Sequence, residues 1–408
     1  MGLGITVWFP VGQSRDNSRE RYEAYFRQIP SVVPNWEPSN FFGKDGFRVT
    51  LVPFEEEVYG SWEDGGLRIE AKTNSAGPGY HAYLVDLLDE LSVAPTEIED
   101  ETGYYSNRDF RSLQNEMGDW LKGLSKHLLE MPNDCTNLAI SLPVDFCVPD
   151  SSEHFTRCPL GYFDRKFFER SQSGEPVGPE FFLWWNQPQD ALFFRNVALR
   201  LIWCKINWLS PQTEEEHKII AATLDCLEQA YTLESCLDYP AAEWIELAQL
   251  TGNKSLVQTL YSRYGDSKKA CLGYQRGNVR QNVCGWSFAR SGRMHSDYEE
   301  DGGLVLWDDN RTIRLSSISA QLNEDIANKS EYLLHSITEN DKDCESFSLC
   351  NPKIAACVQH SQIEENGEPL YQTRLVAALD EQLLIMSLYY VDMADRDWAI
   401  DVCASVTR

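Results

Sequence analysis

The chain has 408 residues, of which 42% are hydrophobic and 12% aromatic. This composition is enough to build the cores of about two or three globular domains, and it excludes a disordered protein. The 63 acidic and 36 basic residues give a formal net charge of −27. Nucleic acids and anionic membranes bind to basic faces, so the charge argues against both and favours a basic protein partner.

No targeting or membrane-spanning segment is predicted. The start of the chain, MGLGITVWFPVG, lacks the charged segment and the long apolar run of a signal peptide. The most apolar stretch, residues 191–209, is interrupted by three basic residues. The twelve cysteines form no C-x-x-C pair, and several lie in apolar helical patterns that suit reduced thiols. We therefore expect a cytoplasmic protein.

Residues 1–150 are predicted to form a mixed α+β domain. Segments rich in β-branched and aromatic residues, bounded by Gly, Pro or Asn, predict strands, and apolar residues at helical spacing predict helices. The expected strands are 5–9, 47–54, 67–72 and 138–146, and the expected helices are 81–92 and 108–130. Strands, then helices, then a strand indicate one layered structure.

Residues 151–265 are expected to pack on this domain as a loop-rich segment followed by a helical block. Its predicted helices are 189–208, 213–235, 240–251 and 253–264. The locally basic residues 266–285 are expected to be a connector, and residues 286–408 a β-rich domain. The strands expected there are 304–309, 312–317, 353–361, 369–379 and 383–390, closed by a helix at 394–406. The predicted fold class is α+β.

A glycine-rich turn opens the helix in NSAGPGYHAYLVDLLDEL, residues 74–91, and raises the question of a phosphate site. Phosphate-binding loops use consecutive backbone N–H donors and a lysine. Pro78 removes one donor, and no Lys-Ser or Lys-Thr pair follows. We interpret Gly77 and Gly79 as turn residues that permit positive φ.

His81 follows this turn and is a candidate base. A hydrolase that uses His81 with a carboxylate such as Asp86 is therefore an alternative function. No nucleophile motif lies beside His81, and no histidines or cysteines have metal-ligand spacing. We expect no catalytic residue, no cofactor and no metal.

Acidic residues gather in short clusters, among them EIEDE at 97–101 and YEED at 298–301. Neither cluster fits a calcium-binding loop, so the alternatives are a solvated surface and an electronegative surface that binds a basic groove. The predicted partner-binding residues are the acids Glu97, Glu99, Asp100, Glu101, Glu299, Glu300 and Asp301, with Tyr104 and Tyr105 as aromatic anchors.

The C-terminal segment 383–406 resembles the ending of PsbP-like and DcrB-like α/β sandwich domains, in which an apolar strand runs into a helix with a characteristic pattern. The matching residues are Asp395, Trp398, Ala399, Ser405 and Val406. This resemblance covers about a quarter of the chain and implies an α/β sandwich at residues 286–408. It implies no active site, because that group has none in common.

The stretch GPGYHAYLVDLLDEL with residues 101–124 is similar to uncharacterised bacterial proteins associated with immunity to secreted polymorphic toxins. The similarity implies a cytoplasmic, non-catalytic protein that binds and occludes a toxin, for example a nuclease with a basic groove. Besides the hydrolase, a secretion adaptor or chaperone is a further alternative. It would expose an apolar groove in place of an acidic face.

Overall fold

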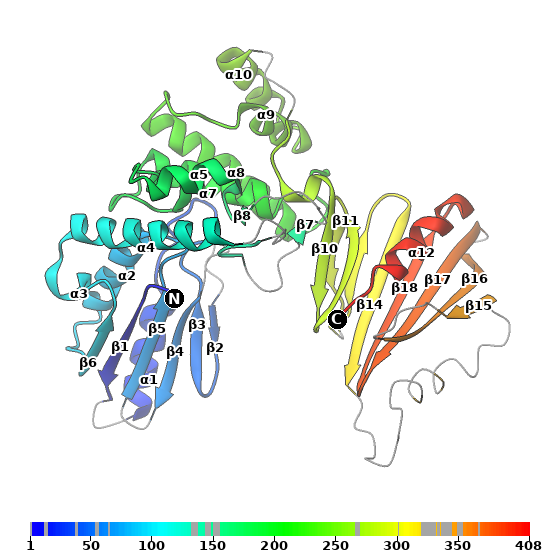
Figure 1. Cartoon of the computed structure of the whole chain (residues 1–408), viewed down its shortest axis with the longest axis horizontal. Coiled ribbons are helices and arrows are strands. Elements are labelled where there is room, and N and C mark those ends of the chain that lie inside the picture. Colours follow the sequence, from blue (N-terminus) through cyan, green and yellow to red (C-terminus); the bar gives the residue numbers. More distant parts are fainter. Residues whose placement is uncertain are drawn as a thin grey trace. The chain divides into compact units, whose positions relative to one another are not determined.

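The computed structural model shows two compact units. The first consists of Met1–Pro143, Ser151–Ile206 and Glu214–Gly273, and the second of Val144–Asp150, Asn207–Thr213 and Tyr274–Arg408. Figure 1 shows their helices and strands. The described residues are 2–11, 15–36, 40–53, 57–63, 66–131, 138–142, 148–149, 156–265, 270–300, 302–319, 332, 335, 345–348, 354–365 and 368–408.

The first unit is built on a six-stranded antiparallel sheet with the order β2-β3-β4-β5-β1-β6. Its strands are β1 (Gly4–Pro10), β2 (Asn40–Phe42), β3 (Gly46–Val49), β4 (Val58–Glu63), β5 (Gly66–Lys72) and β6 (Glu97–Asp100). The strands predicted at 5–9 and 67–72 are confirmed. The strand predicted at 47–54 ends at Val49. The one predicted at 138–146 is reduced to an isolated bridge at Ala139, and residues 143–146 lie outside the described residues.

One face of this sheet is buried because side chains alternate along each strand. Ile5, Val7 and Phe9 of β1 are at most 3% exposed. Helix α1 (Arg15–Arg27) packs on this face through Tyr22, whose ring centroid lies 6.0 Å from that of Phe9. The helical side of the sheet is thus its apolar side.

Helix α2 (Pro78–Glu90) lies against α1, where the Tyr25 hydroxyl donates to the Leu87 carbonyl over 2.7 Å. Further along, several helices begin at an Asp or Asn whose side chain accepts backbone N–H bonds, as Asp109 and Asp190 do. The remaining elements of this unit are α3 (Tyr104–Asn107), α4 (Phe110–Glu130), β8 (Thr156–Cys158), β9 (Gly161–Phe163), α5 (Arg165–Gln172), α6 (Gly178–Phe181), α7 (Ala191–Cys204), α8 (Glu214–Leu233), α9 (Ala241–Leu250) and α10 (Lys254–Tyr264). The predicted helical block is confirmed, and Ser151–Ile206 and Glu214–Gly273 belong to the same unit as the N-terminal sheet. The predicted bounds are corrected at Val144–Asp150 and Asn207–Thr213, which belong to the second unit.

The second unit contains a three-stranded sheet, in the order β11-β10-β7, and a seven-stranded sheet, in the order β12-β13-β14-β18-β17-β16-β15. The three-stranded sheet consists of β7 (Val148–Pro149), β10 (Asn278–Val283) and β11 (Trp286–Ser291). The larger sheet consists of β12 (His295–Tyr298), β13 (Leu304–Trp307), β14 (Arg311–Ser319), β15 (Glu345–Ser348), β16 (Ala355–Glu365), β17 (Glu368–Leu379) and β18 (Gln382–Tyr390). The helical elements are η1 (Tyr274–Arg276), η2 (Met393–Asp395) and α12 (Arg396–Ala404).

The core of the second unit joins the two sheets and α12. Trp286 of β11, Met386 of β18 and Val402 of α12 are buried in one apolar cluster. The connector predicted at 266–285 is corrected in part, because η1 and β10 belong to the second unit and Val279 of β10 is fully buried. Residues 266–269 lie outside the described residues. The α+β fold class is confirmed, with antiparallel sheets in both units.

Among the described helices, none combines the length and the apolarity that crossing a membrane requires.

Candidate interaction surface

Other residues of the chain pack directly against the glycine turn that precedes α2. The Gly79 N–H donates to the Trp184 carbonyl over 2.9 Å, and the Trp184 N–H donates to the Ala76 carbonyl over 2.8 Å. A Cβ on Gly79 would lie 2.1 Å from Cδ1 of Trp184 and 2.4 Å from the Asn186 carbonyl oxygen. Gly77 has a φ of 105°. The turn therefore packs the segment around Trp184 closely on the start of α2, which leaves no room for a phosphate at Gly79.

His81 is fully buried in a network of hydrogen bonds. Its Nδ1 lies 2.9 Å from the Thr73 hydroxyl, and its Nε2 lies 3.2 Å from the Thr102 hydroxyl and 3.4 Å from Oδ1 of Asp100. The Thr102 hydroxyl donates to Asp100 over 2.7 Å. Both ring nitrogens therefore have polar partners within the protein. His81 and Asp100 thus join α2 to β6.

Asp100 is held as a carboxylate. Burial by itself raises its pKa, but the hydrogen bonds with His81, the Tyr105 N–H and Thr102 outweigh burial and hold the pKa well below its ordinary value of 3.8. The Asp100 side chain is 4% exposed, and its Oδ2 accepts from the Tyr105 N–H over 2.7 Å.

His81 and Asp86 do not come together. The Asp86 side chain is 57% exposed, and its carboxylate lies 3.8 Å from the Arg108 guanidinium. Helical geometry places residues five apart on different sides of α2. A carboxylate and a hydroxyl do flank His81, but the ring itself has no exposed surface. The hydrolase pairing of His81 with Asp86 is therefore corrected: the carboxylate near His81 is Asp100.

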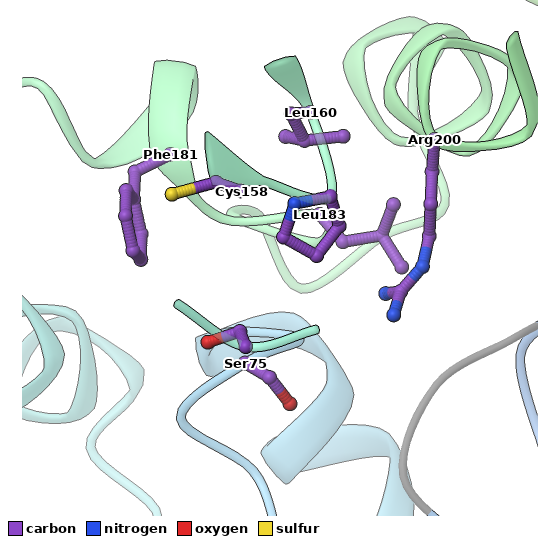
Figure 2. Close-up of a pocket in the computed structure, with 8 residues that line it drawn as sticks. Ser75, Cys158, Leu160, Phe181, Leu183 and Arg200 are labelled. Carbon is purple, nitrogen blue, oxygen red and sulfur yellow. The ribbon is translucent and has the colours of Figure 1, made fainter. Parts of the chain in front are cut away.

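A small cavity in the first unit has Ser75, Cys158, Leu183 and Arg200 among its lining residues (Figure 2). The volume open to the centre of a water molecule is about 10 Å³. About 10–15 Å³ is needed to hold one water molecule. This cavity is too small for a substrate. Within the described ranges of the chain, no three His, Cys, Asp or Glu side chains are grouped so that they could hold a metal ion.

The pleat of β6 divides the acidic cluster 97–101 between two faces. Thr6 is paired with Glu99 and Ile5 with Asp100, and successive side chains of a strand point to opposite sides. Asp100 therefore points to the helical side, toward His81, while Glu97 and Glu99 are exposed on the other side.

The exposed face of this sheet carries aromatic and charged side chains in register. One row crosses all six strands, and it consists of Phe41, Arg48, Tyr59, Glu70, Thr6 and Glu99. A second row contains Ser61, Arg68, Trp8 and Glu97. The side chains of both rows are exposed or half-buried, and Phe41 and Tyr59 are 56% and 47% exposed. We call these two rows the open face.

Charge is unevenly distributed over the open face. The Arg48 guanidinium lies 3.7 Å from the Glu57 carboxylate, and Arg68 forms an ion pair with Glu70. Glu97 and Glu99 form no ion pair with any residue that the structure describes. The β6 end of the open face is thus its electronegative end.

Of the other residues predicted around β6, Tyr104 is 3% exposed, so its prediction as a surface anchor is corrected. Asp100 is likewise buried at its carboxylate. Tyr105 is half-buried, with the Arg108 guanidinium 4.9 Å from its ring centroid. Glu101 is exposed and accepts the Gly4 N–H over 2.9 Å.

The second predicted cluster lies in the turn between β12 and β13 of the other unit. Glu299 and Glu300 are exposed, and the Glu299 carboxylate lies 3.7 Å from the Arg314 guanidinium. Asp301 lies outside the described residues. Beside them, Tyr298 is 67% exposed.

Sequence reasoning missed the open face. Trp8, Tyr59 and Phe41 lie on it, and none was among the predicted contact residues. The alternating side chains of GITVWFP could have predicted this face. Ile5, Val7 and Phe9 point to the buried side of the sheet, so Trp8 points to the other side.

No protein-family model and no curated protein matches the sequence. Among solved structures, the chain is similar to PsbP (CyanoP) from Synechocystis sp. PCC 6803, with 7% identity, a TM-score of 0.25, and coverage of 35% of this chain and 97% of CyanoP. It is also similar to a crystal structure from Bacteroides thetaiotaomicron VPI-5482, with 11% identity, a TM-score of 0.25, and coverage of 30% of this chain and 44% of that chain. The match therefore spans less than half of the Bacteroides chain. The expected PsbP-like resemblance has this distant structural counterpart over part of the chain.

Proposed function

We propose that the chain is a non-catalytic protein-binding protein that binds a basic partner at the β6 end of its open face. The observation that supports this proposal is the exposure of Glu97 and Glu99 beside Trp8, with Tyr59 exposed on the same face at β4. Aromatic side chains supply contact area in interfaces, and uncompensated charge selects the partner. The net charge of −27 adds a long-range attraction for a basic protein.

The more specific form of the proposal is a cytoplasmic immunity protein that occludes a secreted toxin. A nuclease toxin has a basic groove, because it must bind a phosphate backbone. An acidic face in that groove competes directly with the nucleic acid. In this form, occlusion is the whole activity, and the protein transforms no substrate.

A photo-crosslinking experiment in the native cell tests the binding surface. A photoreactive phenylalanine analogue replaces Tyr59 on the open face or, as the control, Tyr261 on α10, which is 41% exposed. We expect a crosslink from position 59 to a protein of net positive charge, and a weaker crosslink when Glu97→Gln and Glu99→Gln are added. Equal yields from positions 59 and 261, or an acidic product, would contradict the proposal.

The immunity function is tested with the purified crosslinked partner. If that partner cleaves nucleic acid, an equimolar amount of the chain should stop cleavage, because a complex on the substrate groove excludes substrate. Cleavage that continues at full rate within a stable complex would refute occlusion.

A further inference from the structure

Among the strands that the structure describes, β6 pairs with β1 along one edge and with none along the other. The sheet order places it last, beside β1, and Figure 1 shows it at the end of the sheet. Glu97 and Glu99 are exposed, and Ile98 is 36% exposed. An edge strand presents a row of backbone N–H and C=O groups that can pair with another chain. The open face therefore ends at an edge that can accept one more strand.

We propose that the partner binds as an extended strand added to β6, with basic side chains at alternate positions and an apolar side chain between them. This inference rests on the proposed function and names how the partner is recognised. In strand addition, backbone hydrogen bonds supply affinity and alternate side chains supply specificity.

The pattern follows from the pleat. Basic side chains directly opposite Glu97 and Glu99 lie on the open face, where oppositely charged cross-strand pairs stabilise a sheet. The side chain between them points to the helical side and lies beside Ile98. A partner segment with the order basic, apolar, basic thus matches β6 at three successive positions.

The same charges disfavour other occupants. A second copy of the chain, paired through its own β6, would bring the exposed carboxylates of Glu97 and Glu99 close to those of its counterpart, and like charges opposite each other destabilise a sheet. Nucleic acid is disfavoured for the same electrostatic reason. The glutamates thus block self-association of this edge and select a basic strand.

Strand β6 is held in position before a partner arrives. Asp100 accepts hydrogen bonds from the backbone N–H groups of Thr102 and Tyr105 and lies beside buried His81. A strand that is already ordered loses little conformational freedom on binding. The recognition edge is thus rigid on its inner side and exposed on its outer side.

Peptide binding to the full chain tests the proposal, with fluorescence anisotropy as the readout. The probe is a labelled peptide of alternating lysine and valine. The controls are a peptide of the same composition with its lysines clustered and an alternating peptide with N-methylated backbone amides. We expect both controls to bind at least about tenfold more weakly, which corresponds to roughly 1.4 kcal/mol. Equal affinities for all three peptides would overturn strand addition, because attraction of charge alone would then explain binding.

Charge reversal at the edge supplies the second arm. The double variant Glu97→Lys, Glu99→Lys should lose the lysine–valine peptide and bind a glutamate–valine peptide instead. The matched control Glu116→Lys, Asp119→Lys makes the same charge change at exposed sites of α4 and should keep the original preference. Binding that is lost equally in both double variants would refute recognition at β6.

The two proposals fail in different ways. If crosslinking of the partner requires Glu97 and Glu99 while no alternating peptide binds, strand addition is refuted but binding at the acidic end of the open face is not. If the edge variant associates with that partner as fast and as tightly as the unmodified chain, the surface itself is wrong.

Discussion

Replacing Asp100 with asparagine tests whether the buried pair with His81 is structural. The carboxylate accepts from the Thr102 N–H over 2.9 Å, the Thr102 hydroxyl over 2.7 Å and the Tyr105 N–H over 2.7 Å. An amide has only one accepting oxygen, so its NH₂ group must face one of these donors. Losing one charge-assisted hydrogen bond with burial of the unsatisfied donor costs about 2 kcal/mol of unfolding free energy at pH 7.

The stability difference also has a predicted pH dependence. The pKa of Asp100 is lowered in the folded state, so its contribution is fully present above the ordinary pKa of 3.8 and is lost as the pH falls through the lowered value. We expect the difference between the unmodified chain and Asp100→Asn to stay constant from about pH 7 to 5 and to shrink in more acidic solution.

The difference in unfolding free energy between the two proteins can be measured by urea titration with hydrogen exchange in α2 as the readout, which reports on the first unit alone. The refuting result is equal stability of the two proteins at pH 7, or a difference that does not change down to about pH 3.

Two further predictions concern packing and thiols. Gly79→Ala should lower the unfolding free energy by about 1–3 kcal/mol, because the added Cβ would clash with the Trp184 side chain. The control Gly123→Ala, with nothing within 4 Å of its Cβ, should leave stability equal or higher in the same urea titration. Burial raises the pKa of the Cys204 and Cys403 thiols to about 12, so iodoacetamide should modify them only after unfolding. Mass spectrometry of the native protein should instead find the exposed thiols modified, namely Cys236, Cys271 and Cys284.

Elements with a long apolar repeat could be predicted from the sequence. Helix α4 buries Leu113, Met117 and Leu121, which recur every four residues, and β18 alternates in burial along most of its length. Their own side chains determine both the element and its buried side. Local sequence contains that information.

Helix α1 has a shorter apolar repeat than α4. Tyr22 and Phe26 are four residues apart and both are buried. The rest of the segment, RDNSRERYEAYFR, is mostly charged or polar, so apolar content alone does not mark it as a helix. Its burial comes from the sheet face that carries Phe9 and Phe47, which a local reading does not include.

Short paired strands could not be predicted from local sequence. The segment EIED has one residue with high strand propensity, and it becomes β6 because β1 supplies its partner far away in the chain. In β10, Val279 is buried between β11 and a β7 segment that precedes it by more than a hundred residues. Pairing over such distances is a property of the fold and not of the segment.

The two sides of β6 explain why the cluster EIEDE has both a structural and a recognition role. Asp100 fixes the strand from the helical side, and Glu97 and Glu99 face outward from the same four residues. Asp100→Asn should therefore weaken strand addition by loosening β6 without changing the charge of the open face, so stronger binding at lower salt should persist. Neutralising Glu97 and Glu99 should do the reverse, weakening the salt dependence while hydrogen exchange in α2 stays unchanged. If both changes altered binding and stability together, the separation of roles along this strand would be refuted.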